Sequence, residues 1–579
     1  MDQNLDDLRH SCAHLLAAAV MDLYPKALRT IGPAIENGFY YDFDNLKISD
    51  SDLPAIEAKM HEIAKSWIGF ERIGIDNDQA IKQFSHNPYK LELIEEYKDQ
   101  DLTLYKSGEF VDLCRGGHVE HPDKELKHFK LLSIAGAYWR GDEKNKMLTR
   151  IYGTCWPTQG ELDKYLWQQE EAKKRDHKKL GPSLELFMFH ETAPGMPYWL
   201  PKGVILYNEL IKFWREEHSK KGYQEIVSPI LNKKELYITS GHYDHYWEDM
   251  FVAKTADEGE YGVKAMNCPN AHIVFGSKTR SYRDLPLRLS DTDTLHRYER
   301  SGTLNGLLRV REFRQDDAHI YVSEDQVEPE YKEVFEIVKR FYSIFGMEYA
   351  FRLGTRNPDN FMGDIETWNK AESTLKTILE HSEVDYSILE GDGAFYGPKV
   401  DILMKDALGR SWQMGTVQLD FQQPRRFKLQ YTDNNGQPQT PIAIHRVVYG
   451  SLERFIGILI EHFGGAFPTW LSPVQVVVLP ISDKHLDYAK KVESQLKSAN
   501  IRVELNEKSE PLNARVRDAE MQKVPYILVV GDREAASDSV SVRRRGTKES
   551  NSQPVSEFIS QISHEISARA NTSTNTPNA

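Results

Sequence analysis

Cysteine is scarce in this sequence: four occur among 579 residues, and no two of them form a C-x-x-C pair. So sparse a set excludes a disulfide framework and indicates a reducing compartment. The first residues, MDQNLDDLRH, lack the basic start and apolar stretch of a signal peptide, and the run from Leu15 to Met21 is too short to cross a bilayer. We therefore expect a cytoplasmic protein that does not act at a membrane.

Positive charge is also in deficit, because 73 Lys and Arg face 87 Asp and Glu, for a formal net charge of −14. The averaged field repels phosphate, which excludes a nonspecific DNA-binding role and confines any RNA contact to local basic patches. Hydrophobic residues make up 40% and charged residues 28%, a globular balance that excludes wholesale disorder. The length predicts several domains, about four.

Changes in composition and in the pattern of hydrophobic residues divide the chain into five predicted segments. Residues 1–157 mix helical and strand patterns, and 158–180 form a charged helical connector. Residues 181–471 alternate short strands with charged turns, which predicts an antiparallel sheet with flanking helices. Residues 472–570 alternate apolar strands with helices, which predicts an α/β domain with a mostly parallel sheet covered on both faces. The polar tail 571–579 is expected to be disordered.

Two residue pairs repeat a four-residue spacing. His10 and His14 lie in RHSCAHLL, a segment of good helix formers that should project both imidazoles from one face. Cys114 and His118 lie in DLCRGGHV. Pairs of this kind can be metal ligands, a general acid–base cluster or partly buried structural groups, and spacing leaves the three open.

Arginines gather between two strand-like runs in LHRYERSGTLNGLLRVREFRQDDAHIYV. The charged residues of this stretch include Arg297, Glu299, Arg300, Arg309, Arg311 and Arg314. They fit either a solvated hairpin with alternating charges or an anion site, because guanidinium groups offer fixed bidentate donors to phosphate. A further arginine, Arg454 in GSLERFIG, lies on an apolar helix and needs a partner.

Three more candidates are scattered. Cys268, His319 and His445 lie 51 and 126 residues apart, so spacing cannot group them, and each alone is most simply a core residue. The segments around all these residues resemble, in the same order, those of the threonyl-tRNA synthetase family of class II aminoacyl-tRNA synthetases. The segments that carry the resemblance include RHSCAHLL, DLCRGGHV, APGMPYWLPKG, MNCPN, SYRDLPLR, FYGPKVDI, WQMGTVQLDF and GSLERFIGILIEHFGGAFPTWLSP.

The resemblance covers nearly the whole chain and implies an α+β multidomain fold. It implies a class II antiparallel sheet with flanking helices, preceded by an α+β editing domain and followed by an α/β anticodon-binding domain. The form expected is one without the N-terminal ubiquitin-like domain that many members carry. The segment GYQEIVSP (residues 222–229) resembles motif 1, which implies a homodimer.

For the amino acid, the resemblance implies that Cys268, His319 and His445 hold one zinc ion per subunit. In the family the open position on zinc binds threonine through its amino group and hydroxyl, with Asp317 placed to accept the hydroxyl proton. Valine has no hydroxyl and would leave both the zinc ion and Asp317 without that partner. Sites built to bind a hydroxyl discriminate against such an analogue by roughly 10⁴ or more.

Serine keeps the hydroxyl and lacks one methyl group. The methyl group changes the binding free energy by about 1–3 kcal/mol, which is too little for accurate selection, so a second, hydrolytic selection is needed. The resemblance places it at His10, His14, Cys114 and His118, a pocket that deacylates seryl-tRNA(Thr). The family pocket is thought to act without metal, although the same ligand types bind zinc in the related alanyl enzyme, so a metal here stays an open question.

For ATP, the resemblance implies that Arg297 contacts the α-phosphate and the threonine carboxylate, Glu299 the adenine, and Arg454 the γ-phosphate, with Mg²⁺ bridging the phosphates. The other residues matched to the adenylate pocket are Arg309, Gln315, Lys399 and Gln413. His242 matches a residue that assists transfer to tRNA.

In the C-terminal segment Glu534 and Arg543 match positions that read anticodon bases, and Arg544 and Arg545 suit phosphates. Gly117 stands where the family usually has proline and Ala271 where it has histidine. We therefore predict a threonine–tRNA ligase that proofreads its product. The alternatives are a noncatalytic RNA-binding paralogue, which would have lost Arg297, Arg454 or the zinc set, and a freestanding deacylase, which would leave residues after 157 unexplained.

Overall fold

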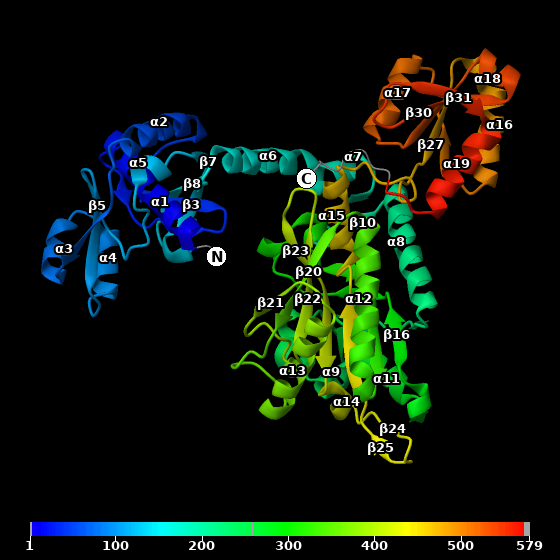
Figure 1. Cartoon of the computed structure of the whole chain (residues 1–579), viewed down its shortest axis with the longest axis horizontal. Coiled ribbons are helices and arrows are strands. Elements are labelled where there is room, and N and C mark those ends of the chain that lie inside the picture. The colour runs from blue at the N-terminus through cyan, green and yellow to red at the C-terminus, as the bar shows by residue number, and fades with distance from the viewer. Residues whose placement is uncertain (1–2, 257–258, 572–579) are drawn as a thin grey trace. The chain divides into compact units, whose positions relative to one another are not determined.

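The computed structural model describes residues 3–256 and 259–571, and the chain divides into two compact units, residues 1–170 and 171–579 (Figure 1). Apart from residue 571, the tail expected to be disordered lies outside the described residues. Among the helices described, none is both long and apolar enough to cross a bilayer.

The first unit is built around one long helix, α1, whose apolar middle packs against a curved antiparallel sheet in the order β1–β3–β8–β7, with β2 paired to β3. A second sheet, β4–β5–β6, carries the loop that follows β6. The elements are α1 (Gln3–Leu23), β1 (Leu28–Arg29), β2 (Ala34–Ile35), β3 (Gly38–Asp44), α2 (Leu53–Ala64), β4 (Glu71–Ile75), α3 (Asn77–Gln83), α4 (Pro88–Glu96), β5 (Leu102–Ser107), β6 (Phe110–Leu113), α5 (Pro122–Glu125), β7 (Phe129–Tyr138) and β8 (Met147–Cys155). The segment predicted as a helical connector contains α6 (Gln159–Arg175) and the start of α7 (His177–Ser183).

The second unit is dominated by an eight-stranded sheet in the order β11–β16–β19–β26–β23–β22–β20–β21. It is antiparallel, as predicted, except at its two edges, where β11 runs parallel to β16 and β21 parallel to β20. Its strands are β11 (Gln224–Glu225), β16 (Leu287–Asp291), β19 (Asp317–Val322), β20 (Glu348–Gly354), β21 (Tyr386–Leu389), β22 (Lys399–Lys405), β23 (Ser411–Asp420) and β26 (Ile442–Val447). The helices that accompany it include α8 (Pro201–Lys220), α11 (Cys268–Gly276), α12 (Val327–Ser343), α13 (Ile365–His381), α14 (Gln423–Arg426) and α15 (Leu452–Phe463).

Smaller elements complete this part of the unit. The helices are α9 (Lys234–Ser240) and α10 (His242–Tyr246). The strands are β9 (Phe187–Met188), β10 (Tyr198–Trp199), β12 (Leu231–Lys233), β13 (Val252–Lys254), β14 (Glu260–Val263), β15 (Arg280–Ser281), β17 (Thr294–His296), β18 (Glu312–Arg314), β24 (Tyr431–Thr432) and β25 (Pro438–Gln439). In the strand-like run LRVREFR (residues 308–314) only the end, β18, is strand; its first residue, Leu308, ends a short 3-10 helix, residues 306–308, that buries the preceding Leu307.

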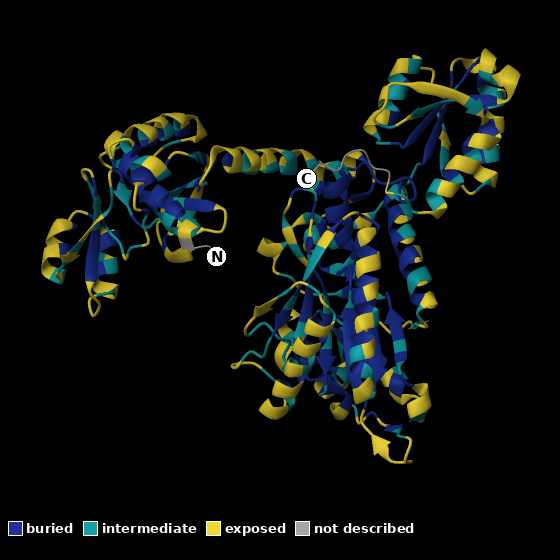
Figure 2. Ribbon diagram, viewed as in Figure 1, coloured by how far each residue is buried: buried dark blue, intermediate teal, exposed yellow. Residues whose placement is uncertain are grey.

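Alternation along the strands gives the large sheet two different faces, because successive side chains point to opposite sides. One face, with Ile320, Val400, Ile402, Val417 and Ile444, packs into the main core together with α8, α12, α13 and α15. Figure 2 shows these strands in the dark blue of buried residues and the yellow of exposed residues along α12. The opposite face carries the polar residues from which the site is built.

After residue 472 the chain forms a five-stranded sheet in the order β28–β27–β29–β30–β31. Its elements are β27 (Val476–Pro480), α16 (Leu486–Ser498), β28 (Val503–Leu505), α17 (Leu512–Met521), β29 (Tyr526–Val530), α18 (Asp532–Ser537), β30 (Ser539–Arg544), β31 (Ser550–Pro554) and α19 (Val555–Ser567). Helices cover both faces, as predicted, with α16 and α19 on one and α17 on the other.

The prediction of a mostly parallel sheet was wrong for two of its four strand pairings. β28, β27 and β29 are parallel, but β30 and β31 are antiparallel. A parallel crossover needs a dozen or more residues, and only the short segment 531–538 separates β29 from β30.

Candidate functional site

Strand pairing brings together two of the three scattered candidates. His319 on β19 lies directly opposite His445 on β26, with their ring centroids 4.8 Å apart. Cys268 is the first residue of α11. The candidate ligand atoms of the three residues all lie within 4.8 Å of one another, and all three side chains are buried. The fold thus groups residues that their spacing along the chain could not.

The surroundings of this triad suit a cation. Nδ1 of His319 is buried and has no hydrogen-bond partner among the described residues. Nε2 of His445 lies 2.9 Å from Oδ2 of Asp420, and a carboxylate that accepts the Nε2 proton leaves the other ring nitrogen with its lone pair. One thiol and two imidazoles form a donor set that zinc takes, and three protein ligands leave a position open. The residues present therefore fit the ion that the resemblance implies.

A carboxylate and an imidazole flank the triad. Oδ2 of Asp317 accepts a hydrogen bond from the side-chain amide of Asn267 at 3.0 Å, and burial raises the pKa of Asp317 above its ordinary value. His242, at the start of α10, places Nε2 3.9 Å from Sγ of Cys268 and Nδ1 2.8 Å from Oγ of Ser240. Burial lowers the pKa of His242 to about 3, so this imidazole is neutral at physiological pH.

Arginines lie on the other side of His242. Arg297 follows β17; its Nε donates to the carbonyl of Ala265 at 3.2 Å, and its charge acts on both His242 and Cys268. Arg454, on α15, has a buried Nε without a hydrogen-bond partner among the described residues. Burial first and then the charge of Arg309 lower the pKa of Arg454. Two like charges that act on each other, one of them partly buried, are an arrangement that an anion would stabilise.

The remaining residues of the arginine-rich hairpin divide into two kinds. Glu299 pairs with Nε of Arg309 at 2.8 Å. Arg311 is buried and donates to the carbonyls of Glu299 and Pro194, so it holds the hairpin together and is not free for a ligand.

Of three further predicted residues, Gln315 follows β18, and Lys399 and Gln413 lie on the eight-stranded sheet. Gln315 pairs through its backbone with Ser451, the residue that caps α15. Lys399 on β22 is bonded to Asp401 at 3.1 Å, and Oε1 of Gln413 on β23 accepts from Arg352 at 2.8 Å. Arg352 also binds Asp401, at 2.9 Å, so one buried carboxylate orders both Lys399 and Gln413.

The first unit holds a second cluster of histidine and cysteine. Its helix places His10 and His14 on one face, and the loop after β6 brings Cys114 and His118 against them. Nε2 of His10 lies 3.0 Å from Sγ of Cys114, Nε2 of His118 lies 3.3 Å from the same sulfur, and the ring of Phe70 stacks on His118 at 4.0 Å. The structure therefore brings together all four residues of the predicted pocket, which we call the editing cluster.

Burial keeps the editing cluster uncharged. It lowers the pKa of His118 to about 3, with the neighbouring His10 as a second cause, and it lowers the pKa values of His10 and His14 as well. It raises the pKa of the Cys114 thiol to about 11. A cavity of about 380 Å³ opens on the cluster. Its wall also contains Lys90, which the sequence reasoning missed.

A charged network lies in the wall of this cavity. Nζ of the buried Lys90 lies 2.8 Å from Oδ1 of Asp112, Nε of Arg29 lies 3.1 Å from the same oxygen, and the hydroxyl of Tyr41 donates to Oδ2 at 2.5 Å. Burial alone would raise the pKa of Asp112, but the charges of Lys90 and Arg29 hold it below its ordinary value. The carboxylate is thus fully engaged by its neighbours.

The candidate anticodon residues lie in the C-terminal part. Oε2 of Glu534 accepts from the backbone N–H of Gly531 at 3.0 Å, and Arg543 on β30 is ion-paired with Glu520. The expectation that Arg545 suits a phosphate was wrong, because its guanidinium donates to the carbonyls of Ala466, Phe467 and Lys523.

Comparison with known proteins identifies the family. The model of the tRNA synthetase class II core domain (G, H, P, S and T) matches residues 251–463, that of the anticodon binding domain matches 475–565, and that of the threonyl and alanyl tRNA synthetase second additional domain matches 102–152. The threonine–tRNA ligase of Thermotoga neapolitana is 51% identical over 97% of this chain and 88% of its own length. The chain belongs to the threonine–tRNA ligase family. The threonine–tRNA ligase of Caldanaerobacter subterraneus subsp. tengcongensis is likewise 51% identical, over 97% of this chain and 87% of its own.

A solved structure agrees. The structure titled as the RNA binding domain of threonyl-tRNA synthetase from Cryptosporidium parvum is 40% identical, has a TM-score of 0.66, and covers 69% of this chain and 99% of that one. Membership of the threonine–tRNA ligase family confirms the predicted resemblance and the predicted fold class.

Several residues of the site carried signals too weak to be found in advance. Asn267 is the neighbour of Cys268 in MNCPN, and Asp420 is the next-to-last residue of WQMGTVQLDF, two residues after Gln418 on the same strand face. Only the pairing of Gln418 with His445 across β23 and β26 indicates that Asp420 is near the triad.

Proposed function

We propose that this member of the threonine–tRNA ligase family activates L-threonine with ATP and transfers it to tRNA(Thr), and that it hydrolyses mischarged seryl-tRNA(Thr) in a separate pocket. The single observation that carries the proposal is the buried triad Cys268, His319 and His445 with Arg297 near enough for its charge to act on Cys268. A site for an amino acid beside a site for phosphate is the arrangement that adenylation requires.

The triad would hold one zinc ion, which when bound supplies a Lewis-acidic position for the amino and hydroxyl groups of threonine. Asp317, which accepts a hydrogen bond from Asn267, would accept the hydroxyl proton of the substrate. Valine offers no hydroxyl, so the buried carboxylate would lose its partner, and this loss rejects valine. His242, beside Cys268, is the proposed residue for the transfer step to tRNA.

The proposed ATP site lies along Arg297, Arg309 and Arg454. The threonine carboxylate attacks the α-phosphate, and catalysis consists of orienting the reactants and neutralising charge. Arg297 would hold the two reacting groups, Arg454 the γ-phosphate, and Glu299 the adenine, and Mg²⁺ would accompany the phosphates. Gln315, Lys399 and Gln413, ordered as described above, would line the adenylate pocket.

The editing cluster would act on the ester bond of seryl-tRNA(Thr). The neutral imidazoles of His10 and His118 would accept a hydrogen bond from the attacking water and orient it, while the thiol of Cys114 would serve as their hydrogen-bond partner. Lys90 and Asp112 in the cavity wall are suited to fix the orientation of the substrate.

We propose further assignments that rest on family membership. The editing, connector, catalytic and anticodon-binding segments would be residues 1–157, 158–180, 181–471 and 472–570, with Glu534 and Arg543 reading the anticodon. The enzyme would work in the cytoplasm as a homodimer. An edge strand, β11, followed by Val227, which is 82% exposed, supports a subunit interface there.

The test of the proposal is ATP–pyrophosphate exchange with a panel of amino acids, combined with metal analysis. We expect one zinc ion per subunit, exchange with threonine, weaker exchange with serine and almost none with valine. Full zinc loading without threonine-dependent exchange would contradict the proposal. For the second activity, purified seryl-tRNA(Thr) should be deacylated far faster than threonyl-tRNA(Thr).

A further inference from the structure

One buried histidine outside the proposed catalytic residues joins three distant parts of the second unit. His177 begins α7, is 1% exposed, and lies 130 and 284 residues away from its two partners. Its Nε2 accepts the backbone N–H of Leu307 at 3.0 Å, and its Nδ1 lies 2.6 Å from Oε1 of Glu461 on α15. A backbone N–H can only donate, so Nε2 carries no proton and Nδ1 must donate to the carboxylate. Both ring nitrogens therefore already take part in hydrogen bonds.

We call the two chains of contacts that start at the ring nitrogens of His177 its arms. The first arm, from Nε2, holds the tip of the arginine-rich hairpin. The base of the hairpin is already tied to α15, because the backbone N–H of Arg314 donates to Glu453 at 3.0 Å. Its tip is held by Leu307, whose side chain is fully buried and which lies two residues before Arg309. Losing the bond to His177 would therefore free the part of the hairpin that carries Arg309 while leaving its base in place.

Two glycines make room for this packing. A Cβ at Gly306 would lie 2.2 Å from Nε2 of His177, and a Cβ at Gly457 on α15 would lie 3.2 Å from Cβ of Leu307. The hairpin tip, α7 and α15 thus meet at one closely packed point. Outside it, Nζ of the exposed Lys178 donates to Asn305 at 3.1 Å, a second tie between α7 and the same tip.

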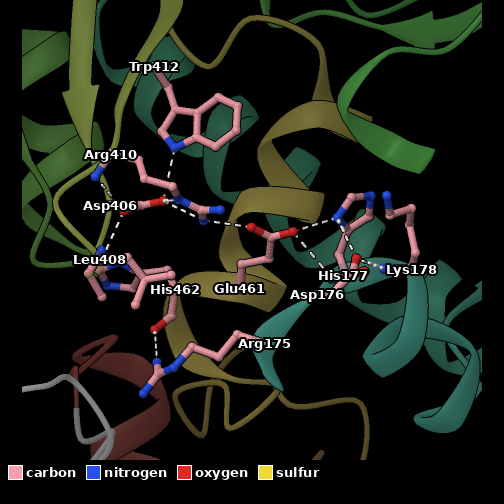
Figure 3. A network of polar contacts seen from close by, with 11 residues as sticks. Arg175, Asp176, His177, Lys178, Asp406, Leu408, Arg410, Trp412, Glu461 and His462 are labelled. Carbon is pink, nitrogen blue, oxygen red and sulfur yellow. Dashed lines mark hydrogen bonds and ion pairs between the residues drawn. The ribbon is translucent and has the colours of Figure 1, made fainter. Parts of the chain in front are cut away.

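The second arm leads to Arg454. Figure 3 shows Glu461 between His177 and Arg410. Nη2 of Arg410 lies 2.6 Å from Oε2 of Glu461, and Arg410 binds Asp406, which accepts from the indole of Trp412 at 2.9 Å.

The indole ends this arm at the phosphate site. The ring of Trp412 lies under two guanidinium groups, with Cζ of Arg410 at 5.1 Å and Cζ of Arg454 at 5.7 Å from its centroid. The two arms that begin at His177 therefore end at Arg309 and Arg454, whose charges already act on each other.

We propose that His177 is a positioning residue for adenylation, which sets the separation of Arg309 and Arg454 so that both engage one nucleoside triphosphate. The inference rests on the proposed ATP role of these two arginines. It does not concern the amino-acid side, because neither arm reaches Cys268, His319 or His445.

Two substitutions separate the arms. In His177→Asn the amide nitrogen takes the place of Nδ1 and can still donate to Glu461, but the acceptor for Leu307 is lost. In His177→Gln the longer side chain can place its carbonyl oxygen near the position of Nε2 and keep that acceptor. We expect His177→Asn to raise the KM for ATP in pyrophosphate exchange roughly tenfold, the equivalent of one lost hydrogen bond, with the KM for threonine unchanged. His177→Gln should recover most of the loss.

The matched control is His485→Gln, at a position away from the hairpin. His485 is also buried; its Nδ1 accepts the backbone N–H of Ser482 at 3.3 Å, and its Nε2 lies 3.1 Å from Oδ1 of Asp532. Glutamine can still donate to Asp532 but loses the acceptor for Ser482, just as His177→Asn keeps the donor and loses the acceptor. We expect His485→Gln to leave the KM for ATP unchanged. Equal kinetics for the His177→Asn and His485→Gln variants, or for the His177→Asn and His177→Gln variants, would overturn the inference.

Lys178→Met provides a second measurement on an exposed residue that is not needed for folding. It should raise the KM for ATP by about two- to threefold, and an unchanged value overturns the inference if the His177 variants do not fold. The Arg454→Ala variant distinguishes a failure of the positioning role of His177 from a failure of the proposed ATP site. If Arg454→Ala leaves the KM for ATP unchanged, the ATP site itself is misassigned. If it raises that KM while His177→Asn does not, only the positioning role is rejected.

Discussion

The two histidine–cysteine clusters use the same residue types and are held in different ways. In the editing cluster, His10 and His118 both contact Cys114, and Asp112, a carboxylate in the cavity wall, is engaged by Lys90. In the triad Cys268, His319 and His445, by contrast, a carboxylate orients one of the histidines directly, through the 2.9 Å contact between Asp420 and His445. Each cluster also has a buried imidazole nitrogen without a partner among the described residues, so this feature alone does not distinguish them.

The comparison indicates that the donor atoms make metal binding by a cluster possible, and that the charges beside the cluster favour or disfavour it. A carboxylate free to accept from a histidine raises the basicity of that ligand and favours a cation. Asp112 is already neutralised by lysine and arginine and does not contact a histidine of the editing cluster in this way.

The largest effect should come from breaking the triad. Cys268→Ser removes the thiolate ligand, so we expect loss of bound metal together with threonine-dependent exchange, a fall on the order of 10⁴ because hydroxyl recognition is lost. Metal analysis and the exchange assay measure the two effects. Cys114→Ser in the editing cluster is the matched control and should keep both metal and exchange. A metal-free Cys268→Ser protein with normal exchange would falsify the ligand assignment.

Next in size is the network beside the editing cluster. Asp112→Asn leaves Lys90 and Arg29 without their counter-charge, and breaking a buried pair costs about 3–5 kcal/mol. We expect faster hydrogen exchange in β5 and β6 and loss of seryl-tRNA(Thr) deacylation, with threonine activation unchanged. Asp99→Asn, at an exposed position, is the control. Unaltered exchange protection in both strands would show that the charges are not needed there.

A smaller change should follow from removing the imidazoles themselves. His10→Ala combined with His14→Ala should spare threonylation and let seryl-tRNA(Thr) accumulate, because the synthetic site alone separates serine from threonine by roughly ten- to two-hundredfold. Charging assays with labelled serine measure this, with His86→Ala at an exposed position as the control. If the double variant clears seryl-tRNA(Thr) at the normal rate, editing takes place elsewhere.

The smallest effect is expected from acid. Since the native pKa of His118 is about 3 and that of an unfolded histidine about 6.5, the unfolded chain binds a proton that the native state does not. The stability due to this group is present above pH 6.5 and is lost progressively as the pH falls toward 3, by about 1 kcal/mol at pH 5.5. Hydrogen exchange of α1 at pH 7.5 and 5.5, corrected for intrinsic rates, measures it. His118→Gln should flatten the pH dependence, and an unchanged slope in that variant contradicts the assignment.

Local patterns predicted much of the fold, and their failures have identifiable causes. The helix at His10 and His14 and the antiparallel character of the large sheet followed from propensity and alternation. Only the end of the run LRVREFR is strand, because the 3-10 helix that overlaps its first residue buries Leu307 beside Gly457 of α15, a contact that no local pattern contains. The polar strand β30 pairs antiparallel because the short segment before it cannot make a crossover.

The site residues also fall into those that the sequence indicated and those that only the structure revealed. Motif resemblance selected Cys268, His319 and His445, but the residues alone left them as separate core positions, and it was the register of β19 with β26 that brought the histidines together. Asp420 and Lys90 were missed, since a carboxylate or a lysine gains its role only from the partner it meets in space.

The sequence by itself determined which chemical groups are present and the local elements that carry them, because helix propensity, strand alternation and turn residues act over a few neighbouring positions. Tertiary structure alone decided which of the 20 histidines act together and which one, His177, links the hairpin to α15. The physical reason is that hydrogen bonds and burial act over a few ångströms in space, while the residues that they join are separated by more than a hundred positions along the chain.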